Sequence, residues 1–217
     1  MNNVEKPQKL IINDWPFRLR LPLQKSDQSP MLLLLHGHLG NENVMWSLTK
    51  PIPDTYLILC PRAPVVMGEN QYSWHKISPN WPTVDTYKKL TDKLLSTVNL
   101  WVEKQGLPIS HYDVMGFSQG AVMAYGLAII YPQLIRKVAA LSGFIPQSWM
   151  KTQKNLEFEN TEFFIAHGRQ DQIIPIQNAR QTINWLGQKN AKVTVCETET
   201  GHKLSVDCFN KLGEFFL

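Results

Sequence analysis

The sequence predicts an α/β fold in which a mostly parallel, doubly wound sheet carries helices on both faces. Short continuous apolar runs, such as residues 31–35, are typical of strands that are buried on both sides. These runs alternate with segments of helical spacing, and such alternation requires crossover connections between parallel strands. We expect the 217 residues to form one domain, 1–217, without an insertion large enough for a separate lid domain.

The first half of the chain begins with a predicted antiparallel hairpin at about residues 9–22, which turns at Asn13 and Asp14. The elements expected after the hairpin are a strand at 31–35, a helix at 41–50, a strand at 55–61 and an amphipathic helix at 83–105 closed by Gly106. Residues 62–82 have no period and are rich in Pro, Gly, Asn and aromatic side chains, which predicts a long surface loop. Loops of this length in compact domains are usually functional.

The second half continues the alternation of strand and helix without a repeat or a linker. The expected elements are a strand at 111–117, a helix at 119–132, strands at 137–144 and 161–168, a helix at 176–188, a strand at 192–199 and a helix at 207–216. In sheets of this kind the functional site lies outside the carboxyl ends of the strands. Catalytic or binding residues are therefore expected in the loops that follow the strands.

Composition excludes several classes of function. The net charge of +4 is mild and the basic residues are scattered, so the sequence gives no indication of nucleic-acid binding. The longest apolar run is far shorter than the roughly 18 residues of a spanning helix, and the N-terminus has no apolar stretch typical of a signal peptide. We therefore expect a cytoplasmic protein without stable membrane insertion.

The chain has three cysteines, Cys60, Cys196 and Cys208, an odd number at wide spacing. This spacing matches neither a disulfide framework nor a metal signature, so we expect buried, reduced thiols. The six histidines likewise lack the helical i, i+4 pair or the Cys-His spacing of a metal site, and no metal is predicted.

Chemically active residues follow four of the predicted strands. They are His36-Gly37-His38 after the first buried strand, Ser118, Asp171, and His202. Because parallel strands present their carboxyl ends at one edge, we expect these residues to converge although they are far apart in sequence. His167, which precedes Gly168 at a strand end, is expected to brace the Asp171 loop through hydrogen bonds.

Ser118 lies in a G-x-S-x-G motif with a buried strand before it and an apolar helix after it. A sharp turn there needs small residues at 116 and 120, and it exposes the hydroxyl at a helix N-terminus, where backbone amides stabilise an oxyanion. The alternative is a serine that only caps the helix. A serine nucleophile needs a base and the base needs an orienting acid, for which His202 and Asp171 are the candidates in the expected chain order. The alternatives are an ordinary loop histidine and a turn aspartate.

These motifs resemble the α/β-hydrolase superfamily, and within it the phospholipase/carboxylesterase group that includes acyl-protein thioesterases. The resemblance spans the chain from about Met31 to the C-terminus, and five stretches carry it: "LLHGHLGNE", "CPRAP", "GFSQGAVMA", "HGRQDQIIP" and "TGHKLS". It implies Ser118 as nucleophile, Asp171 as orienting acid and His202 as base, with no cofactor. It also implies an oxyanion hole formed by the backbone N–H groups of His38 and Gln119.

The resemblance implies hydrolysis of carboxylic esters through an acyl-enzyme intermediate, and the missing lid favours short to medium acyl chains. The alternatives are a lysophospholipase or an acyl-protein thioesterase, then a hydrolase-fold binding protein without turnover, with a peptidase less favoured. The expected partner is a small-molecule or acyl ester or thioester, and the chain is expected to be a monomer or a homodimer. Trp15, Trp81 and Trp149 lie in predicted loops or turns, where they would mark an apolar contact surface.

Substrate preference is only weakly indicated by the sequence. Apolar residues in the strand-end loops suit an acyl chain, although loop packing explains them equally well; they are Met67, Tyr72, Trp74, Phe144, Ile145, Ile173 and Ile174. Lys76 and Arg169 stand where the family tends to have acidic residues. We therefore expect a more basic rim than is usual, which leaves the particular substrate open.

Overall fold

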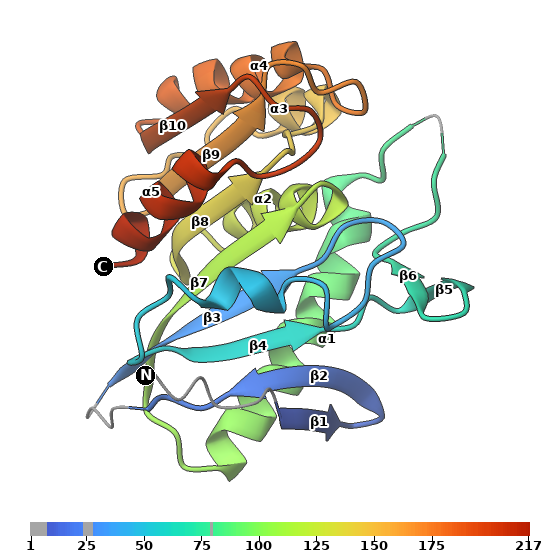
Figure 1. The fold of residues 1–217 in the computed structure, drawn as a ribbon, viewed down its shortest axis with the longest axis vertical. Coiled ribbons are helices and arrows are strands. Elements are labelled where there is room, and N and C mark those ends of the chain that lie inside the picture. The colour runs from blue at the N-terminus through green and yellow to red at the C-terminus, as the bar shows by residue number, and fades with distance from the viewer. Residues whose placement is uncertain (1–7, 24–27, 79) are drawn as a thin grey trace.

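The computed structural model describes residues 8–23, 28–78 and 80–217, and an eight-stranded sheet forms its centre (Figure 1). In spatial order the strands are β1 (Gln8–Ile12), β2 (Trp15–Arg20), β4 (Leu57–Pro61), β3 (Ser29–Leu35), β7 (Ile109–Phe117), β8 (Ile135–Leu141), β9 (Glu162–Gly168) and β10 (Lys192–Thr198). Neighbouring strands from β4 to β10 are parallel, whereas β1 and β2 are antiparallel. The predicted mostly parallel sheet is confirmed.

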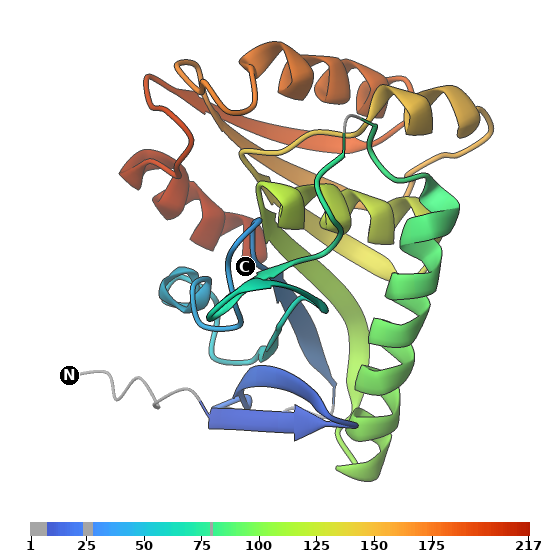
Figure 2. The same cartoon turned by 90° about the vertical axis from the view of Figure 1, so that its right-hand side faces the viewer.

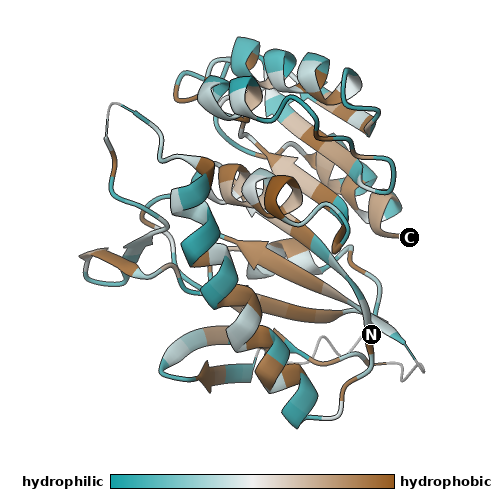
Figure 3. Cartoon of the chain, turned by 180° about the vertical axis from the view of Figure 1, so that it is seen from behind, coloured by the Kyte–Doolittle hydropathy of each residue, from teal (hydrophilic) through white to brown (hydrophobic). Residues whose placement is uncertain are grey.

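Helices cover both faces of the sheet, as predicted. They are α1 (Val84–Lys104), α2 (Gln119–Ile130), α3 (Gln147–Thr152), α4 (Ile176–Gly187) and α5 (Val206–Phe216). Successive residues of a strand point to opposite faces, so Leu33 packs in the core with α1 and α2 while Leu34 packs in the core with α5. Figure 2 shows α1 and α5 on opposite sides of the sheet, and Figure 3 shows the apolar strands between them. Because both strand faces are buried, the sequence presents apolar runs rather than alternation.

The predicted N-terminal hairpin is confirmed. Strands β1 and β2 pair antiparallel, with Ile12 opposite Trp15. The two residues between them, Asn13 and Asp14, both have positive φ, at 48° and 62°. A two-residue turn of this type matches the twist of the flanking strands, and Asn and Asp tolerate positive φ better than other non-glycine residues.

The long helix after the aromatic loop also follows its sequence signals. The Thr83 side chain accepts a hydrogen bond from the Thr86 amide at the start of α1, as an N-cap residue does. At the other end Gly106 adopts a φ of 62°, the left-handed conformation that terminates helices. The prediction of a helix at 83–105 is confirmed.

Two local expectations are wrong and one helix was missed. The segment 41–50 contains only the short 3-10 helix η1 (Trp46–Thr49), because its backbone amides bond carbonyls three residues earlier, Val44 to Asn41 and Trp46 to Asn43, instead of four. The supposed loop 62–82 contains a second, two-stranded sheet formed by β5 (Val65–Gly68) and β6 (Gln71–Ser73). α3 was not expected.

Two of the three tryptophans assigned to a contact surface are core residues instead. Trp15 lies in β2 and Trp149 in α3, and they are 8% and 1% exposed. The described part of the chain holds no inserted lid domain. No helix there is long and apolar enough to cross a membrane.

Candidate active site

Ser118 occupies a sharp turn between the central strand β7 and helix α2. Its backbone has φ 54° and ψ −117°, a conformation that is costly for any residue with a side chain and is found mostly at functional sites. The Ser118 amide donates to the Leu141 carbonyl at 2.9 Å, which ties the turn to β8. The Ser118 hydroxyl makes no capping hydrogen bond to α2, so the alternative of a simple helix cap does not describe its position.

Two glycines make this turn possible by close approach. A Cβ at Gly116 would lie 2.1 Å from the Gly120 carbonyl oxygen, and a Cβ at Gly120 would lie 2.0 Å from the Leu35 carbonyl oxygen. Both distances are far below van der Waals contact with backbone atoms that cannot move aside. The spacing of the motif therefore follows from steric exclusion at both sides of Ser118.

His202 and Asp171 form a hydrogen-bonded pair beside this turn. Asp171 Oδ2 lies 2.7 Å from His202 Nδ1, and the His202 ring packs on the Phe117 ring with centroids 4.9 Å apart. Asp171 Oδ1 accepts the backbone amides of Ile173 and Ile174, each at 2.9 Å. Because the carboxylate accepts at Oδ2, His202 carries its proton on Nδ1 and leaves Nε2 free as a base.

The same contacts determine the charge of Asp171. Burial alone would raise the pKa of its carboxyl group. The Ile174 amide, the His202 ring and the Ile173 amide outweigh burial, so the pKa lies below its ordinary value. Asp171 is therefore an anion that can orient a neutral His202 and stabilise a protonated one.

The loops that carry Asp171 and His202 lie against each other. A Cβ at Gly168 would lie 2.1 Å from the Thr200 carbonyl oxygen, and the Gln170 amide donates to that same carbonyl at 3.0 Å. His167 Nε2 donates to the Ile174 carbonyl at 2.8 Å. The expectation that His167 braces the Asp171 loop is confirmed.

The loop after β3 reaches Ser118 from the other side. A Cβ at Gly37 would lie 3.4 Å from the Ser118 Cβ, which places the following residue, His38, at the edge of the site. Gln119 is the first residue of α2, so its N–H has no acceptor in an earlier helical turn. The backbone amides expected to form the oxyanion hole thus come from segments adjoining Ser118.

His36 fixes this loop, a role that the sequence did not reveal. The side chain is 1% exposed, its Nε2 accepts the Ala63 amide at 2.9 Å and its Nδ1 donates to the Gly37 carbonyl at 2.7 Å. Burial lowers the pKa of His36 to about 4, and its neutral form is the one that can accept from Ala63. Only the tertiary contacts distinguish this histidine from His38.

The residues expected to contact an acyl chain have different positions. Trp74 is 2% exposed and its indole donates to the His36 carbonyl at 2.8 Å, so it supports the His-Gly turn rather than lining an open pocket. Ile145 and Ile174 are also buried, and the Ile174 backbone holds Asp171. Phe144 is half-buried against Trp81, with ring centroids 5.2 Å apart.

The remaining three residues lie at the surface or in another cavity. Met67 and Ile173 are 40% and 71% exposed. Tyr72 accepts from Arg62 at 3.1 Å and lines a cavity of about 440 Å³ whose other walls include Trp15. Ser118, Asp171 and His202 do not line this cavity.

The expected basic rim is only partly present. Arg169 pairs with Glu197 at 3.1 Å and with Glu199 at 2.7 Å, so acidic residues of and beside β10 compensate its charge. Lys76 is exposed. The expectation that Arg169 makes the rim basic is therefore wrong, because two carboxylates at the end of β10 neutralise its charge.

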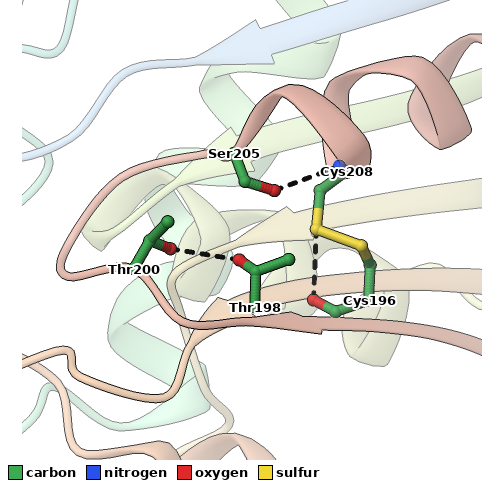
Figure 4. Close-up of a disulfide and its surroundings, with 5 residues drawn as sticks. All are labelled: Cys196, Thr198, Thr200, Ser205 and Cys208. Atoms are coloured by element: carbon green, nitrogen blue, oxygen red, sulfur yellow. Dashed lines mark hydrogen bonds between the residues drawn. A yellow bond between two sulfur atoms is a disulfide. The ribbon is translucent and has the colours of Figure 1, made fainter.

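The expectation of three reduced thiols is wrong. Cys196 in β10 and Cys208 in α5 form a disulfide (Figure 4), and only Cys60 is a free, buried thiol. The bonded residues flank the segment that carries His202. Within the described ranges no cluster of three or more His, Cys, Asp or Glu residues could hold a metal ion.

Comparisons with known proteins agree with this architecture. The model of the phospholipase/carboxylesterase family matches residues 22–216. Acyl-protein thioesterase 1 of Debaryomyces hansenii is 29% identical over 114 residues, 50% of this chain and 49% of that protein. The same protein of Saccharomyces cerevisiae is 32% identical over 102 residues, 45% of this chain and 44% of that protein. The matches therefore span less than half the length of either relative.

Solved structures resemble the chain over most of its length. The Bacillus cereus carboxylesterase has a TM-score of 0.80 at 20% identity, with 94% of both chains covered. The Mesorhizobium loti carboxylesterase has a TM-score of 0.79 at 20% identity, with 95% of this chain and 97% of that chain covered. Zea mays acyl-protein thioesterase 2 has a TM-score of 0.69 at 18% identity, with 91% and 96% covered. At these identities the likeness concerns the fold alone.

Proposed function

Because the chain belongs to the phospholipase/carboxylesterase family and has the α/β-hydrolase fold, we propose that it is a serine hydrolase that cleaves carboxylic esters through an acyl-enzyme intermediate. The observation that carries the proposal is the strained Ser118 turn beside the hydrogen-bonded His202–Asp171 pair. A strained serine, a neutral histidine with a free Nε2 and an oriented carboxylate are the three parts that acyl transfer needs.

In the proposed reaction His202 Nε2 removes the hydroxyl proton of Ser118, and Oγ attacks the carbonyl carbon of the ester. The negative charge that develops on the carbonyl oxygen is stabilised by the backbone N–H groups of His38 and Gln119. The alcohol leaves with the proton from His202, and an acyl group remains on Ser118. Water then attacks this acyl-enzyme by the same route, with His202 again as base and then as acid. Asp171 keeps the imidazole in the required tautomer throughout.

We favour esters of short to medium acyl chain as substrates. The described part of the chain holds no large lid domain and Ser118 is half-buried, an arrangement that suits small esters better than interfacial lipid digestion. A Cβ at Gly143 would lie 3.2 Å from the Ser118 carbonyl oxygen, and the half-buried rings of the following residue, Phe144, and of Trp81 offer apolar contact for a short acyl group.

Thioester hydrolysis is the second candidate. It is favoured by the local sequence identity to the yeast acyl-protein thioesterases, and the same nucleophile and base would serve it. A thiolate leaves more readily than an alkoxide, so the triad would need no further group for that reaction.

The test is hydrolysis of a chain-length series of p-nitrophenyl esters and matched acyl thioesters by the parent protein and by Ser118→Ala. The expected result is a maximum at two to six carbons and a loss of kcat of several orders of magnitude in the variant, because only the oxyanion hole and binding remain. Ser96→Ala, an exposed serine on α1, is the matched control and should keep the parent rate. Equal rates in parent and Ser118→Ala would reject the proposal, and a maximum at long thioesters would select the second candidate.

A further inference from the structure

A buried hydrogen-bond chain links His38 to Gln119, the two residues proposed as oxyanion donors, and Ser73 is its centre. Ser73 lies at the end of β6 and is fully buried, with 0% exposure. Its Oγ lies 3.0 Å from His38 Nδ1 and 2.9 Å from Gln119 Oε1. A third neighbour, the His75 carbonyl oxygen, is 2.6 Å away. The Ser73 hydroxyl therefore contacts one side chain from the loop after β3 and one from the first turn of α2.

The orientation of the Gln119 amide is fixed by its other partners. Oε1 accepts the Trp74 backbone amide at 2.9 Å, and Nε2 donates to the His75 carbonyl at 3.2 Å. The atom that faces Ser73 is thus an oxygen, which only accepts. The His75 carbonyl likewise only accepts.

The proton positions follow from this arrangement. The Ser73 hydroxyl has one hydrogen, and both Gln119 Oε1 and the His75 carbonyl can only receive it. Whichever of them accepts, the hydroxyl has none left for His38, so His38 Nδ1 must donate its own N–H to Ser73. The Nδ1 atom of the His38 imidazole therefore carries a hydrogen, and the Ser73 hydroxyl oxygen accepts it.

A hydrogen bond between backbone atoms supports the same connection between the two segments. The Tyr72 amide donates to the Gly40 carbonyl at 3.0 Å, so β6 holds the loop after β3 on both sides of Leu39. The Gln119 side chain holds residues 73–75 against the first turn of α2. Strand β6 thus connects two segments that are 81 positions apart in sequence, counted from His38 to Gln119.

We propose that Ser73 and the His38 imidazole are positioning groups that set the distance between the two oxyanion donors. This proposal rests on the proposed function, because it assumes that the His38 and Gln119 amides bind an oxyanion. Ser73 is buried and acts only through its neighbours. Oxyanion stabilisation depends on donors that are placed before the reaction begins, and a displacement of about 1 Å costs roughly 100-fold in rate.

The test compares Ser73→Ala and His38→Leu with the parent protein in kcat, KM and the inhibition constant of a trifluoromethyl ketone. The inhibitor adds to the nucleophile and carries a full oxyanion, so its affinity reports the donors directly. Both variants should lose roughly 10- to 100-fold in kcat, keep KM within about threefold, and bind the ketone more weakly by the same factor as kcat. His38→Asn, whose side-chain amide can donate to Ser73, should recover most of the loss.

Controls separate positioning from folding and from the proposed function. The double variant Ser73→Ala/His38→Leu should lose no more than either single variant, because both break one chain. Ser78→Ala, an exposed serine in the same segment, should behave as the parent. If Ser73→Ala does not fold, the half-buried His38 site still tests the proposal through the Leu and Asn variants. An inactive Ser118→Ala together with parent-like kcat and ketone affinity in His38→Leu would overturn the positioning role alone, whereas an active Ser118→Ala would overturn the proposed function.

Discussion

Opening the Cys196–Cys208 disulfide should lower the free energy of unfolding by about 3 kcal/mol. The bond closes a loop across a sequence separation of 12 residues, and chain entropy in the unfolded state assigns a loop of that length about 3 kcal/mol. In a chain of 217 residues, a change of 1 kcal/mol moves Tm by roughly 2 to 4 °C. We therefore expect Tm to fall by roughly 6 to 12 °C when the bond is opened.

Calorimetry of the oxidised protein and of the protein treated with a phosphine reductant measures this shift. Alkylation under denaturing conditions should detect one thiol, Cys60, before reduction and all three cysteines after it. The Cys196→Ala/Cys208→Ala variant should have a lowered Tm that no longer responds to reductant, and Cys60→Ala should keep the response. Three alkylated thiols with an unchanged Tm would refute the reasoning, because the loop constraint would then contribute nothing.

The same thiol count bears on the predicted cytoplasmic location, which stays a prediction. Stable disulfides are rare where glutathione and thioredoxin keep thiols reduced. Alkylation at the moment of cell lysis shows whether Cys196 and Cys208 are bonded in the cell. A bonded pair there favours an oxidising compartment.

Two further predictions concern His36 and Asp171. Burial lowers the pKa of His36 to about 4, so between pH 7 and pH 4 the unfolded chain takes up this proton first and roughly 3 kcal/mol of stability is lost as the pH falls. Urea unfolding of His36→Gln should show a pH dependence smaller by that amount, and equal pH dependence in parent and variant would contradict the assignment. Asp171→Asn should lower kcat by roughly 10⁴-fold with little change in KM, because an amide that donates to His202 Nδ1 moves the imidazole proton to Nε2. An unchanged kcat with p-nitrophenyl acetate would mean that another carboxylate orients His202.

The positions of Ser118, Asp171 and His202 could be predicted because strand ends are visible in the sequence. Apolar runs mark buried strands, and the polar residue that follows each run must lie at one edge of a parallel sheet. The sharp turn at Ser118 could be predicted for a related reason. It leaves no room for a Cβ at positions 116 and 120, so the sequence must have glycine at both. These features depend on local spacing, which the sequence records directly.

Other features depend on which segments meet in space, and local spacing does not record that. The disulfide forms because β10 and α5 pack together, and a sequence separation of 12 is compatible with many folds. Trp74 is an aromatic loop residue of the kind that lines pockets, yet it is buried and its indole N–H donates to the His36 carbonyl. The helix expected at 41–50 does not form because the backbone amides there bond carbonyls three residues earlier instead of four. The spacing of apolar residues along the sequence does not reveal which of these hydrogen bonds forms.

The division between buried and exposed parts of the site indicates where substrate preference resides. His36, Ser73, Gln119 and Asp171 are all buried, at most 6% exposed, and each holds a backbone segment, so substitution there would alter both stability and rate. Ile173, in contrast, is 71% exposed, and exposed positions tolerate substitution at little cost in stability. A family can therefore exchange rim residues of this kind while it keeps the buried frame. Under the proposed function, variants at the exposed loop residues should therefore change KM among acyl substrates more than they change Tm.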